Sequence, residues 1–148
     1  MNAKEEDIYQ QTIDRFWETV PPVWNAVRSH LRSLAAQQFD ITVEQFHILR
    51  YIRRKADSIS ALAAIGRISR PAISQGVDAL VQKGMISRQQ DPSDRRFIRL
   101  ELTPGGNALL DALFARNREW MKTRLAALPP GELDKIKEGL SALIKALE

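Results

Sequence analysis

The side chains best suited to chemistry in this chain lie in the stretch SRPAISQ, from Ser69 to Gln75. The guanidinium of Arg70 offers a fork of donors that matches the two acceptors on the edge of guanine, and the amide of Gln75 matches adenine. Pro71 and Ala72 offer only apolar contact, for example with a thymine methyl group. At the start of a helix, such side chains could read base edges in the major groove of DNA. The set expected to enter the groove is Ser69, Arg70, Pro71, Ala72, Ser74 and Gln75.

The residues around this stretch predict the short helix that must position it. Ser69 can cap the free backbone amides of a new helix, and Pro71 is tolerated in the first turn. Ser69 either caps the helix only or also contacts a DNA phosphate, because both roles use the same neighbourhood. Gly84, directly after Lys83, is expected to end the helix in the left-handed conformation. Apolar residues recur at helical spacing behind the polar first turns, at Ile73, Val77, Leu80 and Val81.

A β-hairpin with a doubly basic tip is predicted directly after this helix. Its strands are expected over residues 85–90 and 95–102, joined by the turn formers DPSD at 91–94. Period two places Arg96 on the same face as Ile98 and points Arg95 the other way. In the second strand Ile98, Leu100 and Leu102 alternate with Phe97, Arg99 and Glu101, which predicts a ribbon with one apolar face.

The two arginines at the tip are therefore expected to have different roles. We expect Arg95 to reach the minor groove and Arg96 mainly to anchor the hairpin, paired with Asp78 on the preceding helix or with Asp94 in the turn. Which of the two arginines enters the groove stays open at this point, and both belong to the predicted DNA-contacting set, as does Arg88.

Upstream of the helix, residues 58–68 (SISALAAIGRI) form a compact, Ala-rich apolar segment in which Leu62, Ala63 and Ile68 can pack. Ser69 then follows as a short break. Helix, tight turn, helix and hairpin in this order make a winged helix-turn-helix, a motif whose second helix enters the major groove.

With these residues in place, the chain resembles the MarR family of bacterial transcription regulators. The resemblance is carried by Leu62 and Ala63, by residues 69–80, by LVQKGMISR at 80–88, and above all by DPSDRR at 91–96 with LTPGG at 102–106. It covers nearly the whole chain and supports a salt bridge between a hairpin arginine and the recognition helix. One departure is Gly66, where members commonly carry a large apolar residue.

The resemblance and the helical periodicity together predict a single domain over residues 1–148, mainly α-helical with a small β-hairpin wing. Residues 5–39 are expected to form a long helix, kinked or split at Pro21 and Pro22, and residues 103–148 two helices separated at 129–131. These are the expected dimerisation helices, on either side of the winged DNA-binding region 42–102. In that region Thr42 and Gln45 begin a helix with a capping box. The apolar stripe of the last helix is expected to pair with another subunit.

The net positive charge of the chain is concentrated on the predicted winged helix-turn-helix. The net charge is +4, and residues 67–99 carry the same net charge of +4, from seven basic residues against three aspartates. The rest of the chain is therefore neutral overall. An excess of positive charge at this place is what binding to DNA phosphates requires.

Composition excludes several other classes of protein. No apolar run approaches the roughly 20 residues that cross a bilayer, and the acidic N-terminus does not resemble a signal peptide, so we expect a cytoplasmic location without membrane association. There is no cysteine for a disulfide, a nucleophile or a thiolate zinc site. His30 and His47, the only histidines, lack metal-ligand spacing, and no phosphate loop or nucleophile elbow appears. We therefore expect no enzyme activity, metal or cofactor.

Several aromatic residues lie on the first, second and fifth predicted helices, where the resemblance implies an effector pocket between the dimer region and the DNA-binding region. Most of these aromatic residues are expected to pack in the core, but His47 and Arg50 among them could hold a small aromatic or anionic ligand. The candidate pocket residues are Trp17, Trp24, His47, Arg50 and Trp120.

The sequence predicts a sequence-specific regulator of transcription that binds a pseudo-palindromic operator in double-stranded DNA as a homodimer. The resemblance to the MarR family implies in addition that it is of the repressor type and is released by a small-molecule effector. The alternative is a winged-helix protein that binds another protein or a small molecule and does not bind DNA. Salt-dependent binding to duplexes separates the two hypotheses.

Overall fold

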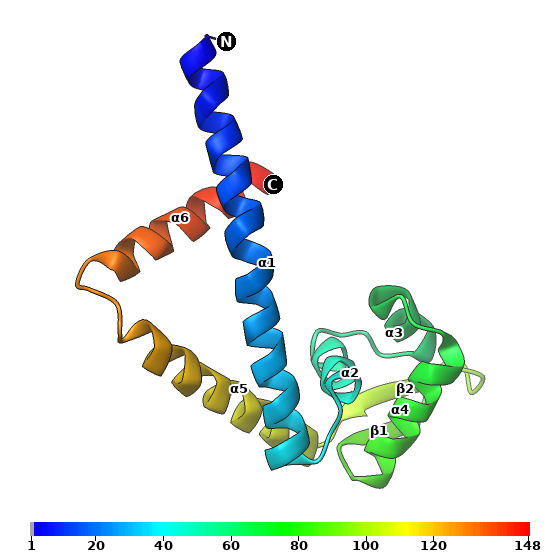
Figure 1. Cartoon of the computed structure of the whole chain (residues 1–148). Coiled ribbons are helices and arrows are strands. Elements are labelled where there is room, and N and C mark those ends of the chain that lie inside the picture. Colours follow the sequence, from blue (N-terminus) through cyan, green and yellow to red (C-terminus); the bar gives the residue numbers. More distant parts are fainter. Residues whose placement is uncertain (1) are drawn as a thin grey trace. The chain divides into compact units, whose positions relative to one another are not determined.

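A computed structural model describes residues 2–148, without the side chain of Ala3. It divides into two compact units, of which the first extends to Leu113 and the second comprises Phe114–Glu148. The first unit contains α1 (Ala3–Phe39), α2 (Val43–Arg53), α3 (Ile59–Gly66), α4 (Arg70–Gln82), β1 (Ile86–Gln90) and β2 (Ile98–Leu102), as Figure 1 shows. The second contains α6 (Glu132–Leu147), and α5 (Pro104–Leu125) begins in the first unit and continues into the second.

Helix α1 is one continuous helix of 37 residues, so of the two outcomes expected at the proline pair, a kink or a split, the split was wrong. Asn2 begins it with a capping box, in which its side chain accepts from the amide of Glu5. Pro21 and Pro22 lie inside the helix and lack the amides that would bond the carbonyls one turn earlier. A single long helix can tolerate this loss where the freed carbonyls face solvent, and Trp17 and Glu18, which carry them, are both exposed.

The motif helices begin where the sequence predicts. Thr42 and Gln45 form the capping box of α2, Ser58 caps α3 through the amide of Ala61, and Ser69 caps α4. Gly84 has a φ of 73° directly after α4, which confirms the expected left-handed end of that helix.

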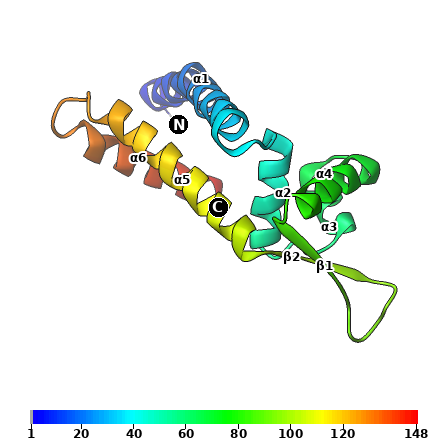
Figure 2. The ribbon, with the colours of Figure 1, turned by 90° about the horizontal axis from the view of Figure 1, so that it is seen from below.

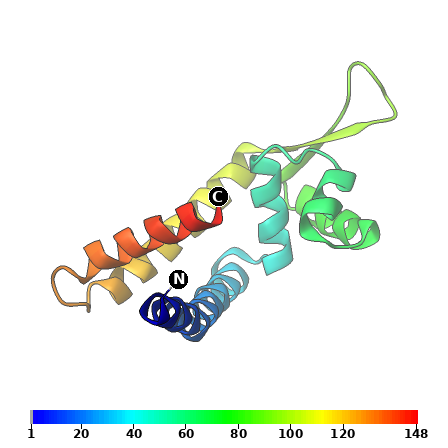
Figure 3. The same ribbon diagram turned by 90° about the horizontal axis from the view of Figure 1, so that it is seen from above.

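The hairpin is shorter on its second side than the alternation of residues predicts. Strands β1 and β2 pair antiparallel from Ile86 opposite Leu102 to Gln90 opposite Ile98. The amide of Leu100 also donates to the carbonyl of Asp57 over 2.8 Å, which ties the outer edge of β2 to the segment before α3. Figures 2 and 3 show that the hairpin tip extends well beyond α3 and α4.

The core of the first unit holds the helix-turn-helix and the base of the hairpin together. Its largest fully buried side chains are Phe46, Leu49, Leu62, Leu80, Leu100, Leu110, Leu113 and Val77. They come from α2, α3, α4, β2 and the start of α5, and each such side chain contributes about 1.5 to 3 kcal/mol when removed from water. No helix in the described residues is long and apolar enough to span a membrane.

Candidate nucleic-acid interface

Helix α4 has a buried side and an exposed N-terminal end. Ile73, Val77 and Leu80 are buried, with Leu62 of α3 in the same core cluster. Six residues lie at the N-cap and first turns on the other side: Ser69, Arg70, Pro71, Ala72 and Gln75 are exposed, and Ser74 is half-buried. The helix is therefore fixed by one face while its first turns stay accessible.

The N-terminus of α4 is capped by a weak local hydrogen bond. The hydroxyl of Ser69 accepts from the amide of Ala72 over 3.3 Å, and Pro71 lies in the first turn, where its missing amide costs nothing. The exposed first turn also carries the positive end of the helix dipole. Arg67, which sequence reasoning counted as charge only, lies exposed in the turn before α4 with a left-handed backbone, φ 51°.

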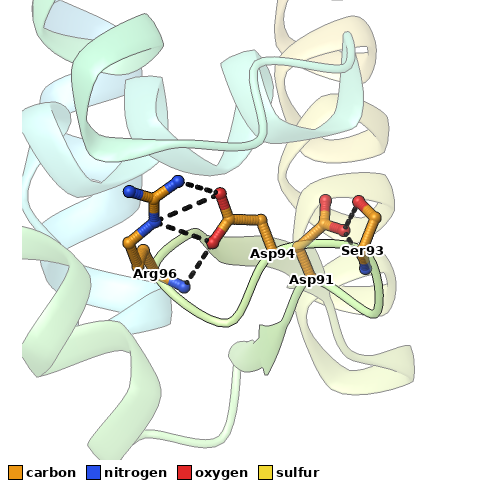
Figure 4. A network of polar contacts seen from close by, with 4 residues as sticks. All are labelled: Asp91, Ser93, Asp94 and Arg96. Carbon is orange, nitrogen blue, oxygen red and sulfur yellow. Dashed lines mark hydrogen bonds and ion pairs between the residues drawn. The ribbon is translucent and has the colours of Figure 1, made fainter.

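The tip of the wing is a turn built from two aspartates (Figure 4). The carboxylate of Asp91 accepts from the amide of Ser93 over 2.8 Å and from its hydroxyl over 2.5 Å. The carboxylate of Asp94 accepts from the backbone amide of Arg96 over 3.0 Å and from its guanidinium, with a shortest distance of 2.8 Å. Two backbone hydrogen bonds close the loop, from Asp91 to Phe97 and from Phe97 to Asp94.

These hydrogen bonds favour the ionised forms of the turn residues. The bonds from Ser93 lower the pKa of Asp91, and the bonds from Arg96 lower the pKa of Asp94. The same contact raises the pKa of Arg96. The turn is therefore held in its hydrogen-bonded form at neutral pH.

The two tip arginines differ in their contacts, although not for the reason given by strand periodicity. Strand β2 begins at Ile98, so Arg95 and Arg96 lie in the turn, and the assignment of their faces by period two was wrong. Arg96 is bonded to Asp94. Arg95 is exposed, and within residues 2–148 no side-chain hydrogen bond or ion pair holds it.

The predicted apolar face of the ribbon is buried only near its base. Leu100 is buried and Leu102 is half-buried. Ile98 is 52% exposed because this part of the hairpin extends beyond the helices that cover its base.

Asp78 on α4 is paired with Arg88 of β1. Sequence reasoning offered Asp78 as one partner for Arg96 and placed Arg88 in the DNA-contacting set. The structure instead uses Arg88 to link the base of the wing to the recognition helix, while Arg88 remains exposed beside it.

Arg99 is a second link, to which sequence reasoning gave no role. Its guanidinium lies 3.2 Å from the carboxylate of Asp91 in the wing turn and 3.5 Å from that of Asp57 before α3. It therefore joins the tip of the hairpin to the body of the motif. Its position in β2, alternating with buried Leu100, was the available signal that its side chain faces away from the core.

The candidate effector residues belong to different units. Trp17 and Trp24 of α1 are largely exposed, and His47 and Arg50 of α2 are half-buried, all in the first unit. Trp120 belongs to the second unit, where the guanidinium of Arg124 lies 5.7 Å from the centre of its ring.

His47 has an unusual environment for a residue of this helix. Its ring stacks on Tyr51 at 6.1 Å, and its buried Nδ1 atom has no hydrogen-bond partner among the described residues. Burial, followed by the charges of Arg50 and Arg28, lowers the pKa of His47 below its usual 6.5, which favours the neutral ring.

Comparison with known proteins agrees with this geometry. The MarR family profile matches residues 39–96. The multiple antibiotic resistance protein MarR of Escherichia coli is 30% identical over 108 residues, which cover 69% of this chain and 75% of that protein. Among solved structures, regulator Tm0710 of Thermotoga maritima superposes with a TM-score of 0.79 at 22% identity, covering 90% of this chain and 94% of the other.

A point mutant of MepR from Staphylococcus aureus, solved bound to an oligodeoxyribonucleotide, has a TM-score of 0.70 at 23% identity and covers 90% of this chain and 98% of the other. At these identities, the two superpositions show that this chain shares the fold of both solved structures and nothing beyond the fold. The family profile, the relationship to MarR and the winged helix-turn-helix together establish that the chain belongs to the MarR family of winged helix-turn-helix transcription regulators.

Proposed function

We propose that the chain is a homodimeric repressor that binds a pseudo-palindromic operator and is released from it by a small aromatic or anionic effector. The observation that carries the proposal is the combination of an exposed, polar N-terminal end on a helix anchored in the core with a hairpin whose tip exposes Arg95. A point mutant of MepR, which shares the fold, has been solved bound to an oligodeoxyribonucleotide.

In this proposal the first turns of α4 read the major groove. Arg70 donates both arms of its guanidinium to a guanine, and Gln75 pairs with an adenine. Ser74 and the apolar surfaces of Pro71 and Ala72 complete the contact. Ser69 both caps α4 and lies where a phosphate would meet the free amides of the first turn.

The wing supplies a second contact, in the minor groove. Arg95 is the residue proposed to enter it, because Arg96 is already bonded to Asp94 and holds the turn in shape. An arginine without a protein partner can exchange water for a phosphate or a base edge without breaking an ion pair. Arg88, which is paired with Asp78 yet exposed, is proposed to contact the backbone near the base of the wing.

Dimerisation is proposed through the helices outside residues 42–102, which are residues 5–39 and 103–148 of a single functional domain. Exposed apolar side chains on these helices support the proposal, because a protein rarely leaves long apolar stripes in water. On α1 they include Ile8, Tyr9, Ile13, Trp17, Val20, Val23 and Trp24. On α6 they include Leu133, Ile136, Leu140, Ile144 and Leu147.

The two recognition helices of such a dimer lie about one helical turn of DNA apart, roughly 34 Å. An effector that favours a different separation by roughly 2 to 3 kcal/mol lowers the affinity for the operator about thirty- to more than a hundredfold. The proposed effector residues are Trp17, Trp24, His47, Arg50 and Trp120.

Titration with salicylate tests the effector proposal. Quenching of tryptophan fluorescence, together with release of the operator at the same concentrations, supports it. No quenching and no release would remove the effector from the proposal, while leaving DNA binding intact.

Selection of bound duplexes from a random pool tests DNA binding itself. The expected product is a pseudo-palindrome whose affinity falls steeply with salt. A pool that yields no common sequence, or binding that does not respond to salt, would favour the alternative of a protein-binding or small-molecule-binding winged domain.

A further inference from the structure

The C-terminal end of α4, the helix proposed to read the major groove, is joined by hydrogen bonds to α1 and to the start of α5. The proposed contacts with DNA do not by themselves require these links. The end itself is closed by two backbone hydrogen bonds, from Gly84 to Val81 over 3.0 Å and from Met85 to Leu80 over 2.9 Å. With Gly84 in the left-handed conformation, this is the Schellman arrangement, in which the carbonyls of Leu80 and Val81 accept and those of Gly84 and Met85 take no part.

The carbonyls of Gly84 and Met85 both accept hydrogen bonds from Thr103, the residue directly before α5. The hydroxyl of Thr103 donates to the carbonyl of Gly84 over 2.5 Å, and the amide of Thr103 donates to the carbonyl of Met85 over 3.1 Å. The same hydroxyl accepts from the amide of Gly106 over 3.0 Å, so it also caps α5. One hydroxyl group therefore joins the last turn of α4 to the first turn of α5.

The contact between the two helix ends is too close for a side chain. A Cβ atom on Gly106 would lie 3.1 Å from the carbonyl carbon of Met85 and still closer to its oxygen. Since these are backbone atoms, they cannot turn aside as a side chain could. Gly106 thus lets α5 begin directly against the segment that follows α4.

A lysine makes the corresponding link to α1. The ammonium of Lys83 donates to the carbonyl of Asp40, the residue that ends α1, and lies 3.6 Å from its carboxylate. Lys83 is also the cap of α4, so its positive charge lies at the C-terminal ends of two helices at once, where helix dipoles favour a cation. The recognition helix is thereby held at one end by α1 and α5.

We propose that Thr103 and Lys83 are positioning residues: by fixing the C-terminal end of α4 to α5 and α1, they set the spacing between operator half-sites that the dimer accepts. The inference rests on the proposed function. If α1 and the helices after the wing form the dimer, the orientation of α4 relative to its partner's recognition helix depends on these links. A looser link allows a wider range of separations, and discrimination between operator spacings then falls.

The test compares duplexes that carry the selected half-sites at the selected spacing, or at that spacing plus or minus one base pair. The readout is the ratio of dissociation constants between the altered and the selected spacing, because a general loss of stability lowers binding to all duplexes alike. Thr103→Val removes both hydrogen bonds of the hydroxyl at nearly constant volume, whereas Thr103→Ser keeps the hydroxyl. Thr123→Val is the matched control, since among the described residues the hydroxyl of Thr123 bonds only to the carbonyl of Glu119 in its own helix.

Thr103→Val is expected to reduce the spacing ratio about three- to tenfold, which lies within the range over which residues that couple two sites act. Thr103→Ser and Thr123→Val should keep the ratio of the unaltered protein. Lys83→Met provides a second variant on the surface, should Thr103→Val fail to fold, and is expected to reduce the ratio while Lys83→Arg retains it. Sedimentation confirms that each variant is still a dimer.

An unchanged spacing ratio in Thr103→Val would overturn the inference, even if the affinity falls equally at every spacing. If that variant does not fold, an unchanged ratio in Lys83→Met would overturn it. If the unaltered protein shows no preference for any duplex, the proposed function fails first, and this inference fails with it. The unaltered protein thus separates the two failures.

Discussion

Replacing Gly106 with alanine gives the sharpest test of how the winged helix-turn-helix is joined to α5. The added methyl group would meet the carbonyl of Met85, with the carbonyl carbon at 3.1 Å and Cα at 3.4 Å. Forcing extra volume into a packed site costs about 1 to 3 kcal/mol. The carbonyl that must move accepts a hydrogen bond from the amide of Thr103. If that bond weakens, a further loss of about 1 kcal/mol in stability is expected.

Alanine returns part of this cost because it forms helix better than glycine by about 1 kcal/mol. The expected net destabilisation of Gly106→Ala is therefore about 2 kcal/mol, which lowers the melting temperature by roughly 4 to 8 °C for a chain of this length. Urea unfolding followed by circular dichroism, at one fixed protein concentration, measures it.

Two other glycines provide graded controls. At Gly66 an added Cβ would make only ordinary contacts, the nearest at 3.4 Å with Ile68, so Gly66→Ala should be neutral or stabilising by up to about 1 kcal/mol. At Gly76 the nearest atom is the flexible tip of Ile48 at 2.6 Å, which can rotate, and the effect should fall between the other two. A Gly106→Ala protein as stable as Gly66→Ala would refute the close approach of α5 to Met85.

Three further predictions concern the DNA-reading surface. Arg95→Ala should weaken operator binding and reduce the slope of affinity against salt concentration by about one unit for each lost phosphate contact; equal slopes for variant and unaltered protein would reject the role of Arg95. Because hydrogen bonds lower the folded pKa of Asp94, they stabilise the wing turn above the ordinary aspartate value of 3.8, and this contribution is lost as the pH falls through the folded pKa. Carbon NMR of the carboxyl group should give a midpoint below 3.8 that rises in Arg96→Ala, and an unmoved midpoint would contradict the contact. Ser69→Ala should destabilise the fold by about 1 kcal/mol through loss of the cap of α4, as judged by urea unfolding, and no change would mean that the cap contributes little.

The fold followed from the sequence where signals were local. The capping box at Thr42, the cap at Ser69 and the left-handed Gly84 each depend on residues within one turn of the chain, and each was found where predicted. The proline pair was misleading only as a sign of a split, because prolines report lost hydrogen bonds, whereas the long α1 keeps its remaining ones on either side.

Contacts between distant segments could not be predicted in the same way. Nothing in the spacing of residues distinguishes Arg88 from Arg96 as the partner of Asp78, since the choice depends on where β1 passes over α4. The alternation of residues extended the second strand to Arg95, but the hydrogen bonds of Asp91 and Asp94 close the turn and delay β2 until Ile98. The LTPGG motif was recognised by resemblance, and its physical reason, the close approach of Gly106 to Met85, appears only in three dimensions.

The most direct test of the central claim is a footprint of the protein on the duplex selected from a random pool, with the stoichiometry measured on the same complex. Two protein chains for each duplex, protecting two symmetric half-sites whose centres lie about one helical turn, roughly 34 Å, apart, is the predicted result. One chain for each duplex, or protection of a single half-site without symmetry, would contradict it.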